Sequence, residues 1–72
     1  MKSLLENLEI SLAAARVNAK MTQREMAEYV GVTVDTVVNW EKGKSEPSTS
    51  QLRKISQISK IPMDFIFVDS KS

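Results

Sequence analysis

The chain contains neither histidine nor cysteine among its 72 residues, and these absences limit the chemistry that its side chains can perform. Without histidine, the usual general base near neutral pH and every Ser-His or Cys-His catalytic arrangement are missing. Without cysteine, there is neither a disulfide framework nor a Cys-ligated zinc site. No glycine-rich phosphate loop is present, and the scattered carboxylates suit helix capping or ion pairing. We therefore predict that the protein is not an enzyme and that it uses no metal and no cofactor.

The side chains with the most informative types and spacing lie between Gln23 and Trp40. A helix-turn-helix needs two short helices that cross through a tight turn. Ala27 supplies a small residue midway along the first helix, and Gly31 supplies a residue that tolerates positive φ in the turn. Apolar residues that can hold the corner stand on both sides of the turn: Met26, Val30, Val32, Val37 and Trp40. The set predicts a helix-turn-helix at about residues 22–41.

Capping signals divide the chain into the helices that must position this stretch. Three capping boxes, in which each side chain satisfies the other residue's backbone amide, are formed by Ser3 with Glu6, Thr22 with Glu25 and Ser48 with Gln51. The first box opens a helix whose apolar residues recur at helical spacing to about Asn18. The second opens a helix that ends at Gly31, and Thr33 caps a third helix that ends at about Glu41. The third box opens a fourth helix, and Pro62 starts a short fifth one.

Size and composition agree with one small domain. A chain of 72 residues supports one compact core, and 42% hydrophobic with 26% charged residues is typical of globular proteins. No apolar run is long enough to cross a membrane, and the N-terminus lacks the apolar core of a signal peptide, so we expect a cytoplasmic protein. The net charge is only +1, so any nucleic-acid binding must depend on where the charges lie. The predicted architecture is one all-α domain over residues 1–72, with five helices and a frayed tail at about residues 69–72.

The stretches QREMAEYVGVT (residues 23–33) and NWEKGKSEP (residues 39–47) resemble the Cro/CI-type helix-turn-helix family. That family includes lambdoid phage repressors and Cro, small bacterial regulators and some antitoxins, and the resemblance covers roughly residues 8–68. It implies a compact five-helix, lambda-repressor-like domain that inserts its third helix into the major groove of double-stranded DNA. It also implies a bacterial or phage transcription regulator, above all a repressor, that binds a palindromic operator as a homodimer. No membrane partner and no small-molecule ligand are evident.

The resemblance assigns DNA contacts to the matching positions. Base contacts are expected from Val34 and Asp35, with Val38 and Gln23 as further candidates. A valine can pack against a thymine methyl group, and a carboxylate can accept a hydrogen bond from cytosine N4. Phosphate contacts are expected from Arg24, Thr33, Thr36, Asn39, Lys42 and Lys44. For the two lysines, ordinary solvated charge is the alternative interpretation.

Two further residues match positions that form an ion pair inside similar repressors. They are Arg16 in the first helix and Glu41 at the end of the third. We expect a structural pair between them, and the loss of one partner should cost more than the pair itself contributes.

The third helix departs from the family pattern, because no Arg, Lys or Gln stands at its expected base-reading positions. Readout would then depend on methyl contacts and DNA shape. The alternative is that the same scaffold serves as a protein-interaction or antitoxin module. Val38 either faces DNA or lies deeper in the domain, whereas the spacing of Trp40 from Val37 favours a core position over an exposed stacking platform.

The C-terminal stretch holds more apolar side chains than one short turn can bury. Some of them should pack against the first helix. Phe65, Phe67 and Val68 are the candidate dimer patch. In a longer parent protein, they would instead lead into another domain.

Overall fold

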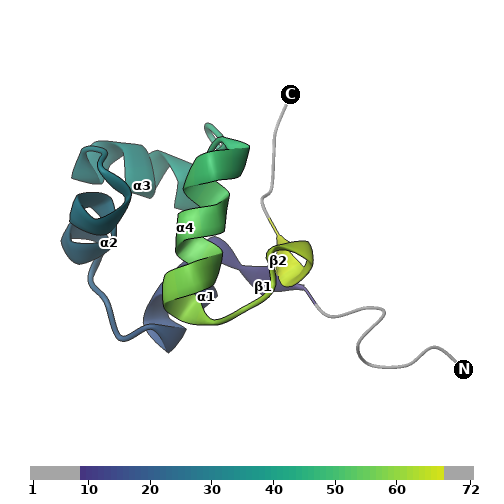
Figure 1. The fold of residues 1–72 in the computed structure, drawn as a ribbon. Coiled ribbons are helices and arrows are strands. Elements are labelled where there is room, and N and C mark those ends of the chain that lie inside the picture. The colour runs from purple at the N-terminus through teal and green to yellow at the C-terminus, as the bar shows by residue number, and fades with distance from the viewer. Residues whose placement is uncertain (1–8, 68–72) are drawn as a thin grey trace, which may run out of the picture.

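The computed structural model describes residues 9–67. Its α-helices are α1 (Leu12–Asn18), α2 (Gln23–Val30), α3 (Val34–Glu41) and α4 (Thr49–Ser59). One 3-10 turn, η2 (Met63–Phe65), follows α4, and the two-residue strands are β1 (Ile10–Ser11) and β2 (Ile66–Phe67). The strands pair in parallel, with Ile10 opposite Ile66 and Ser11 opposite Phe67. This β1–β2 ladder and the α2–α3 pair lie at opposite ends of the domain (Figure 1).

The first helix begins later than the sequence analysis predicted. It starts at Leu12, because the Oγ of Ser11 accepts a hydrogen bond from a first-turn backbone amide at 3.0 Å. Ile10 and Ser11, which we expected inside the helix, form β1 instead, since their backbone pairs with β2. The predicted end at Asn18 is confirmed. The Ser3–Glu6 capping box lies outside the described residues.

The predicted count of five helices is wrong for the described part of the chain, which has four α-helices. Pro62 begins only the single 3-10 turn of η2. The turn ends because Ile66 adopts extended backbone, with φ −85° and ψ 114°, and joins the ladder with β1. Residues 9–67 are therefore all-α apart from this short ladder. The tail predicted at 69–72 lies outside the described residues.

The two remaining capping boxes are confirmed. Thr22 Oγ1 accepts from the amide of Glu25 at 3.0 Å, and the Glu25 carboxylate accepts from the amide of Thr22 at 2.8 Å. Ser48 and Gln51 make the same reciprocal pair at 3.2 and 2.7 Å. Thr33 caps α3 as predicted. These contacts join residues only three apart, so the local sequence is sufficient to specify them.

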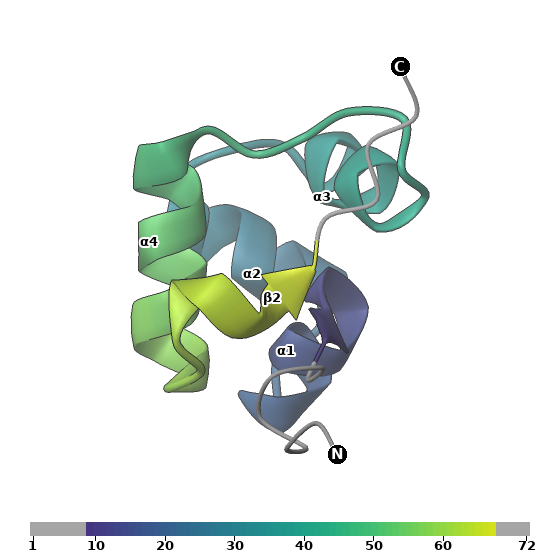
Figure 2. The ribbon, with the colours of Figure 1, turned by 90° about the vertical axis from the view of Figure 1, so that its right-hand side faces the viewer.

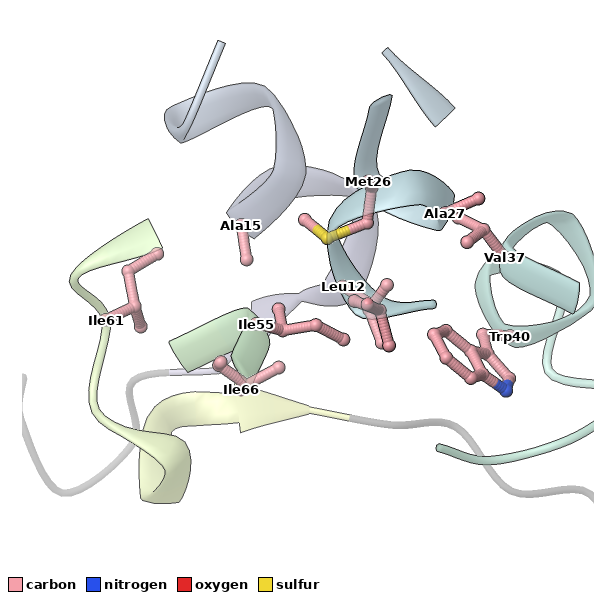
Figure 3. Close-up of a cluster of buried hydrophobic side chains, with 10 residues drawn as sticks. Leu12, Ala15, Met26, Ala27, Val37, Trp40, Ile55, Ile61 and Ile66 are labelled. Atoms are coloured by element: carbon pink, nitrogen blue, oxygen red, sulfur yellow. The ribbon is translucent and has the colours of Figure 1, made fainter. Parts of the chain in front are cut away.

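The core lies where the helices meet, and its largest fully buried side chains come from three of them: Met26 of α2, Val37 of α3 and Ile55 of α4. Trp40 is 4% exposed and lies at one edge of this cluster, so its indole is a core group and not a stacking platform (Figure 3). Ala27 is 2% exposed, as the close approach of α2 to its neighbours requires. At the other end of the core, β2 lies against α1 (Figure 2).

A residue of positive φ follows each of the four α-helices within two residues of its end: Lys20 (60°), Gly31 (93°), Gly43 (78°) and Lys60 (62°). After α1, α2 and α3, the amide of the following residue bonds back to a carbonyl of the last turn at 3.2, 2.9 and 2.9 Å, as in a Schellman motif. Glycine adopts this conformation freely, but a residue with a Cβ atom does so at a cost of about 1 kcal/mol. The two lysines therefore hold strained backbone.

This strain predicts opposite effects for two substitutions. Lys20→Gly should raise the free energy of unfolding by about 0.5–1 kcal/mol, and Gly31→Ala should lower it by about 1–2 kcal/mol, in urea denaturation. A Cβ atom added at Gly31 would meet no atom within 4 Å, so the expected loss comes from the backbone alone. Ala19→Gly is the control, because Ala19 has φ −83° and should gain nothing. An equal rise in the free energy of unfolding for Ala19→Gly and Lys20→Gly would show that the positive φ of Lys20 is not the cause.

Candidate DNA-binding surface

A three-residue turn, residues 31–33, joins α2 to α3. Gly31 takes the left-handed conformation, and the amides of Gly31 and Val32 both donate to the carbonyl of Ala27, at 2.8 and 2.9 Å. The Val32 side chain packs against the core and so holds the corner from the other side. The turn thereby sets the direction in which α3 leaves the corner.

At the start of α3, two threonine hydroxyls bond to each other. Thr33 Oγ1 lies 2.9 Å from Thr36 Oγ1, and it also accepts from the amide of Thr36 at 3.3 Å. Both residues were expected to contact phosphate, and Thr33 is exposed while Thr36 is half-buried. The pair closes the first turn of the helix and leaves few hydroxyl groups free there.

The outward face of α3 is defined by Asp35, Val38 and Asn39 of the helix and by its C-cap, Lys42, which lie opposite the buried side. The buried side is formed by Val37, at 0% exposure, and Trp40. The other three residues come three, four and seven positions after Asp35, a spacing that places all four on one side of a helix. Asp35 and Lys42 are exposed, and Val38 and Asn39 are half-buried. Val38 therefore faces outward with only part of its surface accessible.

Three other residues expected to contact DNA differ in exposure. Val34 is half-buried and packs against the core, so it flanks the face and does not lie at its centre. Arg24 on α2 and Lys44 after α3 are exposed. The structure thus places Asp35, Val38 and Asn39 on one side of α3 and leaves both cations accessible to solvent.

Gln23 has a role that the sequence analysis missed. Its side-chain Nε2 donates to Glu41 Oε1 at 3.0 Å, so the nitrogen of the amide expected at a base edge is bonded within the domain, although the residue is half-buried. Nothing in the spacing of two residues eighteen positions apart signals this bond, because it exists only once α2 and α3 are folded against each other.

Arg16 and Glu41 form an ion pair between α1 and α3, at 2.7 Å from Arg16 Nε to Glu41 Oε2. A second nitrogen, Nη2, lies 3.4 Å from the other carboxylate oxygen, and Nη1 donates to the backbone carbonyl of Met21 at 2.9 Å. The two side chains are only 17% and 9% exposed, so the pair is largely removed from water. Together with Gln23, they join α1, the loop after it, α2 and α3.

The candidate dimer patch can be placed only in part. Phe65 is half-buried and packs against the protein's own core, so little of its surface is left for a partner. The side chain of Phe67 and the whole of Val68 lie outside the described part of the structure.

Three other kinds of feature were not found in residues 9–67. They contain no group of three or more acidic residues, histidines or cysteines that could hold a metal ion, and their surface has no pocket. No helix among them is long and apolar enough to cross a membrane.

Comparison with known proteins assigns the family. The Helix-turn-helix family profile matches residues 12–66, most of the chain. An uncharacterized HTH-type transcriptional regulator of Archaeoglobus fulgidus is 40% identical over 53 residues, which cover 74% of this chain and 75% of that protein. Regulators of the same description from Sinorhizobium medicae and Rhizobium meliloti are 36% identical over 50 residues. No solved structure matches the chain. The chain belongs to the helix-turn-helix family, a family of DNA-binding transcription regulators and not of enzymes.

The matches differ in how much of each relative they cover. The aligned part is 69% of this chain but only 36% of the two rhizobial regulators. The match to this chain therefore spans little more than a third of the length of these two regulators.

The Arg16–Glu41 pair predicts a large and non-additive effect on stability. Arg16→Met should lower the free energy of unfolding by about 2–4 kcal/mol, because it leaves the Glu41 carboxylate desolvated beside an apolar side chain. The double variant Arg16→Met, Glu41→Met should lose less than the sum of the two single losses, as measured by urea denaturation of all four proteins. Additive losses would show that the two charges do not depend on each other.

Proposed function

We propose that this protein regulates transcription by placing α3 in the major groove of an operator. The observation that supports it is the outward face of α3, whose four side chains contribute nothing to the buried core while the opposite side of the helix anchors it. A single α-helix fits the major groove of B-DNA, so a firmly anchored helix with an accessible face is suited to base reading. The relatives, named as transcriptional regulators, agree with this function.

Exposed cations beside α3 are proposed to bind the DNA backbone. Arg24, Lys42 and Lys44 are all exposed, and none of them forms an ion pair within residues 9–67. Contacts to phosphate fix the register of a protein on DNA without reading its sequence. A chain of net charge +1 can bind DNA in this way, because Lys42 and Lys44 directly follow α3 in the sequence and Arg24 lies near the start of α2.

We further propose that two copies bind one palindromic operator and repress transcription by blocking polymerase. One recognition helix covers only a half-site, and a second copy doubles both the base contacts and the phosphate contacts. In this arrangement the half-site centres lie about 10 base pairs apart, on one side of the duplex.

Selection from randomised duplex DNA at low and near-physiological salt tests this proposal. Recovery of a palindrome with half-sites about one helical turn apart would support it. Binding that shows no sequence preference and disappears as salt rises would contradict it, and would favour the protein-interaction or antitoxin module on the same scaffold.

Replacing one of the grouped cations should weaken DNA binding without changing sequence preference. Lys44→Ala should reduce affinity for all duplexes by a similar factor and lower the slope of log K against log salt by about 0.9, the value for one phosphate contact. Fluorescence anisotropy across a salt series measures both quantities. Lys60→Gly is the control: it removes the same charge from the far end of α4 and relieves a positive φ, so binding and slope should not change. Equal slopes for the Lys44→Ala variant and the unsubstituted protein would show that Lys44 does not contact a DNA phosphate.

A further inference from the structure

We propose that α3 reads its half-site through three side chains, Asp35, Val38 and Asn39, and that these select a cytosine, a thymine methyl group and an adenine. This inference rests on the proposed function and specifies the DNA that it requires. It narrows the α2 and α3 positions that the family resemblance offers for base or phosphate contact, because the structure shows which of their side chains already make contacts within the domain.

Four of the neighbouring candidates already make contacts within the domain. The hydroxyls of Thr33 and Thr36 bond to each other at 2.9 Å. The side-chain amide of Gln23 donates to Glu41 at 3.0 Å. Val34 packs against the core and lies to one side of the outward face. The Gln23 nitrogen and the Val34 side chain are therefore in use within the domain, and the threonine pair keeps only one hydroxyl hydrogen free to donate.

Asp35 is the exposed acidic group at the start of the outward face, and within residues 9–67 it has neither an ion-pair partner nor a side-chain hydrogen bond. An ionised carboxylate can only accept hydrogen bonds. In the major groove, only cytosine N4 and adenine N6 donate, and adenine places its N7 acceptor beside N6. The same negative charge is repelled by guanine O6 and N7 and by thymine O4. Asp35 therefore favours cytosine.

Val38 lies one helical turn after Asp35 on the same face. Its side chain is apolar and half-buried, so it can offer only van der Waals contact. The 5-methyl group of thymine is the apolar group that the four ordinary base pairs present in the major groove. Val38 therefore favours a thymine next to the position read by Asp35.

Asn39 lies four residues after Asp35, and its backbone carbonyl accepts from the amide of Lys44 at 2.9 Å. Its side-chain amide has no hydrogen-bond partner within the described residues, and this group is half-buried on the outward face. A carboxamide offers one donor and one acceptor side by side, which match N7 and N6 of adenine. Asn39 therefore favours adenine.

The spacing of the three residues limits how far apart their bases can lie. Four residues of α-helix span about 6 Å, close to two base-pair steps of about 3.4 Å each. The three contacts therefore fall within about three consecutive base pairs, and the bases can belong to either strand.

The test combines operator selection with single-atom changes in the DNA. The operator selected by the unsubstituted protein should contain a fixed cytosine. In the D35N variant, the ratio of the affinity for cytosine to that for the other bases at this position should fall about tenfold. Replacement of the contacted thymine by uracil removes only its methyl group and should weaken binding about threefold to fivefold. The same replacement should have little effect on the Val38→Ala variant, and N39A should relax the preference for adenine at one position.

Asp64→Asn is the matched control, because it removes an exposed carboxylate from η2, outside the helix-turn-helix, and should keep the cytosine preference. A selected operator whose cytosine preference survives D35N, or whose binding does not change with uracil, would overturn the inference while leaving the proposed function intact. Failure to select any operator would overturn both. The uracil experiment uses the unsubstituted protein, so it does not depend on the folding of a variant.

Discussion

The guanidinium of Arg16 sets the position of α3, and with it the surface that the protein presents. It binds the Glu41 carboxylate at the end of α3 and the carbonyl of Met21 in the loop before α2. The same carboxylate accepts from Gln23 at the start of α2. Two charges so far removed from water are tolerated only when their remaining hydrogen bonds are satisfied, and here they are. This network and the apolar contacts of Val37 and Trp40 hold α3 from both its end and its buried side.

Such anchoring matters because base reading needs a rigid helix. The contacts that hold α3 use its buried side and its last residue, so the line from Asp35 to Lys42 remains accessible. The surface that results is not strongly basic: it has a carboxylate at one end, a lysine at the other, and a valine and a carboxamide between them. Backbone binding can then come from cations beside the helix, and discrimination among bases from the few groups on its face.

Much of the architecture was predictable because it depends on residues close together in the sequence. The Thr22 and Ser48 capping boxes each involve partners three residues apart, and the left-handed turn at Gly31 follows from the absence of a Cβ atom. The burial of Trp40 followed from its helical spacing to Val37. The strained ends at Lys20 and Lys60 were not predictable, because lysine has no preference for positive φ.

The sequence by itself determined the helix-turn-helix, its caps and the residue types available for recognition, since propensity, periodicity and capping are local properties. Only the tertiary structure decided the rest. Ile10 and Ser11 leave the helical pattern because β2, more than fifty residues later, pairs with their backbone. Gln23 turns inward because folding brings Glu41 within 3.0 Å of its amide. Val34 lies beside the outward face of α3 and Val38 on it, because the direction in which α3 packs decides which valine contacts the core.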